Sequence, residues 1–192
     1  MPETPDQPTI YTIGHGNTSV DQFIALLHDQ FGIITVLVDV RSMPYSRYIP
    51  DFNREHLPHH LAKIGIKYSF AGDQLGGRPD DPTCYKNGEV PDGKIAKNRY
   101  LKLVDYDEVA KRDFYQSGLH RLLTLAQSQT VVIMCSEENP DHCHRSHLIT
   151  KSLLISGIPV KHIRHDGQII IPNLTIDSST KTEPPASQLS LF

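Results

Sequence analysis

Reactive side chains gather in one short stretch of this sequence. Cys135 is followed eight residues later by the run Cys143-His144-Arg145, and Glu137 lies between them. A thiol beside an imidazole can act as a nucleophile whose proton the histidine carries, and a nearby guanidinium lowers the pKa of such a thiol. We therefore expect Cys135 or Cys143 to be a nucleophile or a ligand. His144 would carry protons, and Arg145 would bind an anionic group.

The segment that carries Cys143 and His144 is predicted to open a helix. Asn139 is a good capping residue, and Pro140 suits the first helical position. Cys143 and His144 would then lie in the first turns, where exposed N–H groups and the helix dipole favour anions and lower the pKa of a thiol. The same place suits a phosphate or carboxylate group of a substrate.

A metal site is a second interpretation of these residues, with zinc as the expected ion. Soft and borderline ligands of the kind that zinc prefers are offered by Cys135, Cys143, His144 and the more distant His15. His147 follows Cys143 by four residues, on the same face of the predicted helix. The spacing is not a standard zinc signature, and a cysteine that ends a buried strand is commonly an inert core residue. A cysteine nucleophile, a metal site and an inert core cysteine therefore all remain possible interpretations.

Apolar periodicity predicts the elements that must position these side chains. Strands are expected at 10–13, 33–40, 67–70 and 131–134, and helices at 19–32, 53–64, 106–127 and 139–157. We expect Pro58 to interrupt the second helix and Gly118 the third. Two further strands, 160–163 and 168–171, flank Asp166-Gly167, the dipeptide of a two-residue hairpin turn. The alternation predicts a three-layer α/β domain: a mostly parallel sheet with helices on both faces and a C-terminal hairpin at its edge.

The carboxyl ends of the predicted strands place further candidates near the cysteines, because ligands of open α/β sheets bind at that edge. His15 follows the first strand, Asp39 and Arg41 follow the second, and Cys135 with Glu137 follows the fourth. We expect these segments to converge on one rim. There His15 would carry protons, Asp39 or Glu137 would orient a neighbour, and Arg41 would bind an anion. The alternatives are an Asp39–Arg41 ion pair that holds the next loop and a histidine that caps its own turn.

Two loops supply the remaining candidates. Aromatic and basic residues interleave at 45–54, where Tyr45 and Arg47 could stack on a base and contact a phosphate. The stretch 71–100 is rich in Gly and Pro, lacks apolar periodicity and is predicted to be a long loop. Its segment Leu75-Gly76-Gly77-Arg78 is expected to lie over the site as a lid, with Arg78 available to an anion.

Length and composition bound the class of protein. A chain of 192 residues with 38% hydrophobic content suits a single domain, expected at 9–173, between flexible tails at 1–8 and 174–192. We find no apolar run of membrane-spanning length and no secretory signal, and three cysteines argue against a disulfide framework. A cytoplasmic protein is therefore expected. A net charge of −3 predicts only weak intrinsic binding to DNA or nucleotides.

The last five residues, Gln188-Leu189-Ser190-Leu191-Phe192, resemble the short peptide by which bacterial repair and replication proteins bind the sliding clamp of DNA polymerase. Leu191 and Phe192 would be the apolar anchors, with Gln188 as the polar one. Tethering would supply the effective concentration at DNA that a mildly acidic domain lacks. The resemblance implies a bacterial protein held at the nucleoid through the clamp. The alternative is a terminus that packs on its own domain.

Several motifs taken together resemble the family catalogued as domain of unknown function 488. They are Thr12-Ile13-Gly14-His15-Gly16-Asn17, Val38-Asp39-Val40-Arg41, Phe52-Asn53, Leu75-Gly76-Gly77-Arg78, and Met134-Cys135-Ser136-Glu137 with Cys143-His144-Arg145. The resemblance covers about 10–163. It implies the α/β fold and a shared site but no reaction, and some members carry DNA-repair labels.

The sequence thus predicts a DNA-repair or nucleotide-processing protein, recruited to the sliding clamp, with a Cys/His/Arg site. Its reaction would be a hydrolysis or transfer, either Cys/His-based or assisted by a metal. One alternative is a non-catalytic adaptor that recognises a nucleotide, a modified base or a protein partner. Another is a metal-dependent hydrolase.

Overall fold

The computed structural model describes residues 7–92 and 97–173, and within them six strands form one sheet in the order β3-β2-β4-β1-β5-β6. The strands are β1 (Ile10–Gly14), β2 (Val36–Asp39), β3 (Lys67–Phe70), β4 (Val131–Cys135), β5 (Val160–Ile163) and β6 (Ile169–Ile170). The first five run parallel, and β6 pairs antiparallel with β5. The mostly parallel sheet with a hairpin at its edge is confirmed.

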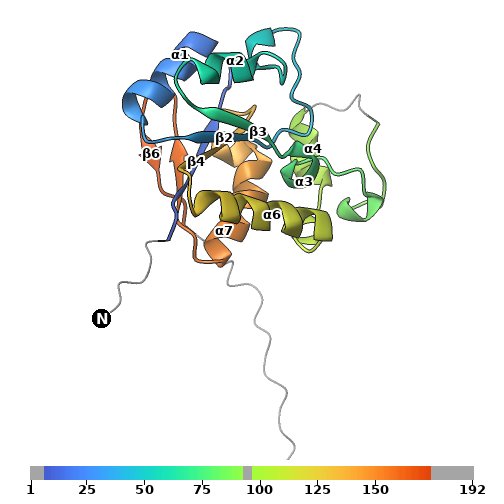
Figure 1. Ribbon diagram of the computed structural model, residues 1–192. Coiled ribbons are helices and arrows are strands. Elements are labelled where there is room, and N and C mark those ends of the chain that lie inside the picture. Colours follow the sequence, from blue (N-terminus) through green and yellow to red (C-terminus); the bar gives the residue numbers. More distant parts are fainter. Residues whose placement is uncertain (1–6, 93–96, 174–192) are drawn as a thin grey trace, which may run out of the picture.

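Helices cover both faces of the sheet, as Figure 1 shows. The α-helices are α1 (Val20–Ala25), α2 (Leu57–Ala62), α3 (Gly72–Leu75), α4 (Lys97–Leu103), α5 (Tyr106–Val109), α6 (Asp113–Ala126) and α7 (Lys151–Ile155). Shorter pieces are the 3-10 turns η2 (Pro50–Phe52), η3 (Pro82–Cys84) and η4 (Pro140–His142) and the π-helical segments η1 (Leu26–Gln30) and η5 (Arg145–Thr150). Helices α1 and α2 lie on one face, and α6 and α7 on the other.

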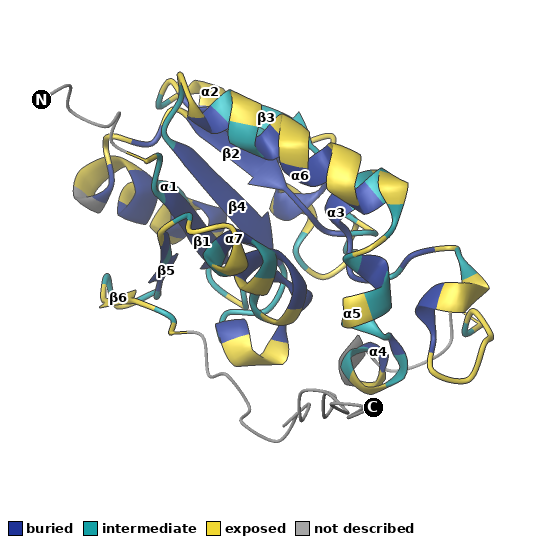
Figure 2. Ribbon diagram, turned by 90° about the horizontal axis from the view of Figure 1, so that it is seen from below, coloured by how far each residue is buried: buried dark blue, intermediate teal, exposed yellow. Residues whose placement is uncertain are grey.

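Alternating side chains of the same strands enter two separate apolar clusters. On the α6/α7 face, Ile133 of β4 packs with Leu119 and Leu153, and on the α1/α2 face Val132 packs with Phe23 and others. The central strands are therefore buried on both sides and covered by helices whose outer surfaces are exposed, as Figure 2 shows. This burial explains why the strands are nearly continuous apolar runs.

Three local predictions are wrong in detail. Pro58 lies at the start of α2 rather than interrupting a helix, because the first turn needs no N–H from that residue. Helix α6 runs through Gly118, where a Cβ would lie 2.7 Å from Gln74 Cβ, so the glycine serves close packing. The β5–β6 hairpin has a three-residue loop, since Arg164 N–H donates to Gln168 O and Gly167 takes a positive φ of 81°.

Some predictions fall outside the described residues. The peptide Gln188–Phe192 lies in the range 174–192, which the structure does not describe. Within the described ranges, no helix combines the length and apolarity that crossing a membrane requires.

His162 of β5 gives the fold a specific dependence on pH. Its Nδ1 lies 2.7 Å from Thr12 Oγ1, and burial, aided by the charge of Arg145, lowers the pKa of His162 to about 4 from 6.5. As the pH falls below 6.5, the unfolded chain therefore binds a proton that the folded chain excludes until about pH 4. Above pH 6.5 His162 is neutral in both states and costs the folded state nothing, and the unfolding free energy decreases as the pH falls from 6.5 toward 4.

Between pH 7 and pH 5 the unfolding free energy of the wild type should fall because His162 resists protonation in the folded state. We predict that in His162→Gln this fall is smaller by about 2 kcal/mol. Denaturant unfolding at the two pH values measures the difference. The same change at the exposed His120 should leave the wild-type difference in place. An equal pH dependence in His162→Gln and wild type would contradict the prediction.

Candidate functional site

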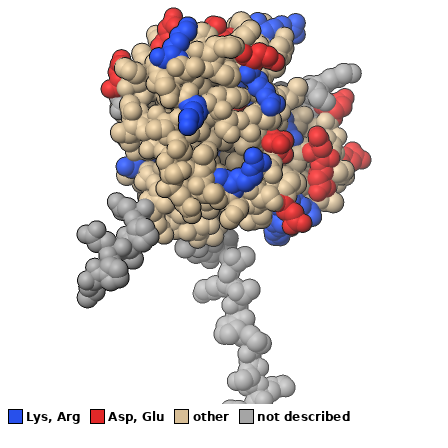
Figure 3. Space-filling view, in the orientation of Figure 1, with Lys and Arg blue, Asp and Glu red and all other residues tan. Residues whose placement is uncertain are grey.

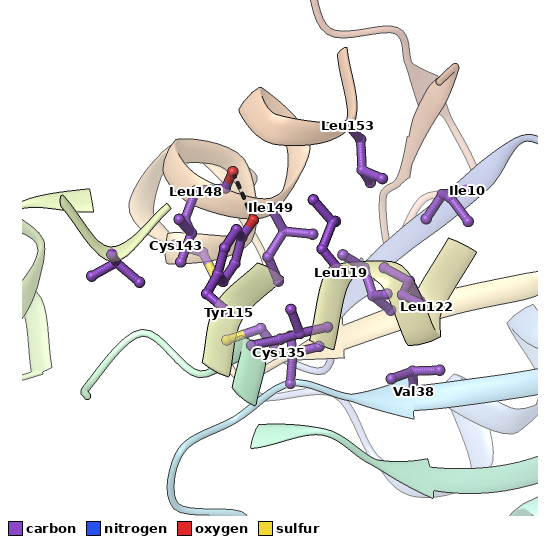
Figure 4. Close-up of a cluster of buried hydrophobic side chains, with 14 of the residues drawn as sticks. Ile10, Val38, Tyr115, Leu119, Leu122, Cys135, Cys143, Leu148, Ile149 and Leu153 are labelled. Carbon is purple, nitrogen blue, oxygen red and sulfur yellow. Dashed lines mark hydrogen bonds between the residues drawn. The ribbon is translucent and has the colours of Figure 1, made fainter. Parts of the chain in front are cut away.

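Two sulfur atoms and one ring nitrogen meet at the carboxyl edge of the sheet. His144 Nδ1 lies 3.6 Å from Cys135 Sγ and 3.7 Å from Cys143 Sγ, and the three donor atoms all lie within 4.8 Å of one another. All three side chains are buried, with 6%, 2% and 7% of Cys135, Cys143 and His144 exposed. Figure 4 shows both cysteines among the apolar side chains of the α6/α7 face, near Tyr115 and Leu148. The predicted Cys/His cluster therefore exists in space.

The segment that carries Cys143 differs from the predicted helix. Asn139 caps only the short turn η4, in which Pro140 opens the first position. Cys143 itself is extended, with φ −137° and ψ 142°, and η5 begins only at Arg145. The prediction that Cys143 and His144 lie in the first turns of an α-helix is wrong for Cys143, which precedes the helical segment and accepts at its carbonyl from the N–H groups of Ser146 and His147. His144 has helical dihedrals directly before η5. The extended backbone of Cys143 turns its thiol toward Cys135.

The two thiols have opposite pKa shifts. A hydrogen bond with Cys143 and the nearby His144 and Arg145 hold the pKa of Cys135 well below its usual range, although burial opposes this. Burial and the neighbouring Cys135 raise the pKa of Cys143. The backbone N–H of Arg145 donates to Cys143 Sγ at 3.5 Å. Cys135 is therefore the more acidic of the two thiols.

Within the segment Leu75-Gly76-Gly77-Arg78, which we expect from the sequence to be a lid, Gly77 lies against His144. A Cβ on Gly77 would lie 2.5 Å from His144 Cγ, so the bare Gly77 backbone packs directly on the imidazole. Tyr106 donates from its hydroxyl to Gly77 O at 3.3 Å, and burial together with the charges of Cys143 and Cys135 raises the pKa of Tyr106. The packing of Gly77 and the contacts of Nδ1 with the two sulfur atoms orient the ring, whereas His144 Nε2 is buried without a partner among the described groups.

Arg145 is fully buried and joins the loop after β4 to the segment after η4. Its guanidinium donates to Glu137 O and, at 2.7 Å, to Glu138 O. Gly14 makes room for this arrangement, because a Cβ there would lie 1.7 Å from Glu137 O. The Gly14 position in the Thr12–Asn17 motif therefore lets the Cys135-bearing loop cross the end of β1.

The other predicted rim residues lie on the opposite face of the sheet. Residues paired in parallel register point to the same face, and Cys135 pairs with Gly14 whereas Asp39 pairs with Met134. Arg41 bonds Asp39 through Nε–Oδ1 at 2.9 Å and Nη2–Oδ2 at 2.6 Å. The structure therefore divides the expected single rim into two groups.

The Asp39–Arg41 pair ties several segments together. Arg41 Nη2 donates to Phe52 O at 2.6 Å, and Tyr68 of β3 donates to Asp39 Oδ2 at 2.8 Å. His15 Nε2 lies 3.3 Å from Arg41 Nη1, and the His15 ring stacks on Phe52 with centroids 4.5 Å apart. His15 is consequently not among the residues that meet at the sulfurs. The predicted alternative, an ion pair that holds the next loop, matches this geometry.

The remaining candidates differ in their access to solvent. Tyr45 and Arg47 are exposed, with 68% of Tyr45 accessible, and Arg47 stacks over Tyr48 at 5.5 Å. Arg78 is half-buried and stacks over Tyr100 at 4.2 Å. Glu137 is half-buried and contributes its carbonyl to Arg145. Tyr45 and Arg47 are thus the candidates best placed to reach a large ligand.

Sequence reasoning missed a polar group beside the loop after β4. Glu138 accepts hydrogen bonds from Arg164 at 2.6 and 2.7 Å, and His165 Nε2 lies 2.7 Å from Gly14 O. Glu138 and His165 also line a surface pocket of about 650 Å³, together with Asn17 and Gln22. No sequence pattern predicts the Glu138–Arg164 hydrogen bonds, because the two residues are 26 positions apart.

The buried ion pair predicts a large difference between two arginines. Arg41→Met would leave the Asp39 carboxylate buried without its cation, and we expect a loss of about 3–5 kcal/mol of unfolding free energy. Arg47→Met, on an exposed loop, should change stability by less than about 0.5 kcal/mol. Denaturant unfolding of both variants tests this, and equal midpoints would refute the structural role of Arg41.

Comparison with known families gives a match that spans these residues. The family model described as Domain of unknown function DUF488 matches residues 19–151, which include the Asp39–Arg41 pair, the Gly76-Gly77 segment and the Cys135–Arg145 stretch. Neither a curated protein nor a solved structure matches. Because the match spans more than half of the chain, this protein belongs to the family of domain of unknown function DUF488.

Proposed function

We propose that this protein is a DNA-repair or nucleotide-processing enzyme whose chemistry takes place at Cys135, Cys143 and His144. One observation carries the proposal: His144 Nδ1 lies within 3.7 Å of both sulfur atoms at the carboxyl edge of a parallel sheet. Enzyme sites of open α/β sheets occupy that edge. A thiol whose pKa is depressed by specific partners is typical of functional cysteines.

The class of substrate is proposed from the exposed loop after β2 and from the tail. The loop after β2 exposes Tyr45 and Tyr48 beside Arg47, a combination that suits base stacking and phosphate contact. On the face shown in Figure 3, Lys and Arg are interspersed with Asp and Glu, and no continuous basic surface is visible there. Such a domain gains little affinity for DNA from charge alone.

We propose that the clamp supplies this affinity. The sequence Gln188-Leu189-Ser190-Leu191-Phe192 has the pattern of a clamp-binding peptide, and binding through it raises the effective concentration of the domain at DNA. The clamp would thus decide where the enzyme works, and the Cys/His centre would decide what it does.

The recruitment proposal predicts a loss of clamp binding when the anchors are removed. Each buried apolar anchor of such a peptide contributes about 2 kcal/mol, so Leu191→Ala with Phe192→Ala should weaken binding roughly 1,000-fold. Binding of the full chain to purified bacterial sliding clamp measures this. Ser190→Ala in the same peptide is the control and should bind as wild type does. Equal affinity of all three chains would refute recruitment.

The catalytic proposal predicts that Cys135→Ser abolishes function while Cys84→Ser does not. Cys84 is the matched control, because it is also a buried free thiol but lies outside the Cys/His centre. Survival of DNA damage, in cells whose own gene is replaced by each variant, provides the readout. Circular dichroism and unfolding midpoints establish that both variants fold.

The outcome also separates an enzyme from a non-catalytic adaptor. The adaptor has one observation in its favour, since the pocket beside Glu138 and His165 opens to the surface whereas the cysteines are buried. An adaptor would retain full survival in Cys135→Ser and lose it in Glu138→Ala. That pair of results would overturn the catalytic proposal.

A further inference from the structure

The three converging donor atoms have the geometry of a metal site. A tetrahedral zinc ion with Zn–S bonds of about 2.3 Å and a Zn–N bond of about 2.05 Å holds each S···N pair about 3.6 Å apart. The observed distances from His144 Nδ1 are 3.6 Å to Cys135 Sγ and 3.7 Å to Cys143 Sγ. In the residues that the structure describes, this is the one group of three His, Cys, Asp or Glu side chains arranged in this way.

We infer that the centre binds one zinc ion through Cys135 Sγ, Cys143 Sγ and His144 Nδ1. The inference rests on the proposed function, because it names the cofactor of the same centre. Two thiolates and a neutral imidazole favour zinc over the hard cations magnesium and calcium, which take oxygen ligands. The predicted fourth ligand, His15, lies on the opposite face of the sheet with Arg41 and Phe52.

The charge balance of the buried site also favours a divalent cation. Two thiolates side by side in an apolar interior repel each other. Zn²⁺ balances the charge of the two thiolates. The backbone N–H of Arg145, 3.5 Å from Cys143 Sγ, would donate to the ligated thiolate.

The donor set also says what kind of zinc site this is. Structural zinc sites have four protein ligands, whereas catalytic sites keep three and leave one position for water or substrate. Three protein ligands are present among the described residues, and no fourth His, Cys, Asp or Glu of the described part belongs to this group. A zinc-bound water there would serve as the nucleophile of a hydrolysis, which selects metal-assisted hydrolysis over a free cysteine nucleophile.

The test begins with the wild-type chain. Full-length protein, purified without an affinity metal, should contain about one zinc ion per chain by elemental analysis. After removal of the zinc by a chelator, titration with Co²⁺ should saturate at one equivalent and give the thiolate charge-transfer and tetrahedral ligand-field absorption of a sulfur-rich site. A chain that neither contains zinc nor takes up one equivalent of Co²⁺ would overturn the inference without any mutation.

Matched variants locate the ion. Cys135→Ser, Cys143→Ser and His144→Ala should each reduce the zinc content to background and abolish the charge-transfer band. Cys84→Ser and His147→Ala should retain one zinc, since Cys84 is a buried thiol elsewhere and the exposed His147 contacts Asp141 O. Unchanged zinc content in the first three variants would place the metal elsewhere and overturn the inference.

The same preparations separate this inference from the proposed function. If the wild-type chain restores survival after DNA damage but contains no zinc when it is purified and takes up no Co²⁺, the zinc site is refuted and a cysteine-based enzyme remains. If the wild-type chain binds one zinc ion but Cys135→Ser gives normal survival, the catalytic proposal is refuted. Loss of both zinc and survival in Cys135→Ser, with both retained in Cys84→Ser, supports the two together.

Discussion

Arg145 is the largest fully buried side chain in the described part of the chain, and the Cys/His centre depends on it. Its guanidinium binds the carbonyl groups of Glu137 and Glu138, and its own backbone follows directly after Cys143 and His144. The loop that leaves Cys135 is therefore held against the segment that brings the second thiol. Gly14 allows this because any larger residue would collide with Glu137 O. One buried cation thus joins β1, β4 and η5 at a single point.

The centre then follows from electrostatics in a dry interior. Two thiolates within 4.8 Å of each other in an apolar interior repel each other unless a cation lies between them. Cys135 has the lower pKa of the two thiols, because Cys143, His144 and Arg145 favour its ionised form. The distances from His144 Nδ1 to both sulfur atoms leave room for a divalent cation among the three donors.

Much of this arrangement could be predicted from the sequence, but not its division between two faces. Strand ends located His15, Asp39 and Cys135 at the carboxyl edge, because apolar runs mark strands well. Which face each residue takes depends on the register between β2 and β4, a long-range pairing that no local pattern encodes. Packing overrode the usual effect of Gly118 on a helix, and the contact of Tyr106 with Gly77 spans 29 residues. The extended Cys143 was missed because capping residues predicted a helix where only η4 forms.

The central claim is that Cys135, Cys143 and His144 form one metal-binding centre, and X-ray absorption at the zinc edge of the purified full-length protein tests it most directly. The account predicts a first shell of two sulfur atoms at about 2.3 Å and one imidazole nitrogen at about 2.0–2.1 Å, completed by one light atom. A shell made only of oxygen and nitrogen, or one containing a single sulfur atom, would contradict it.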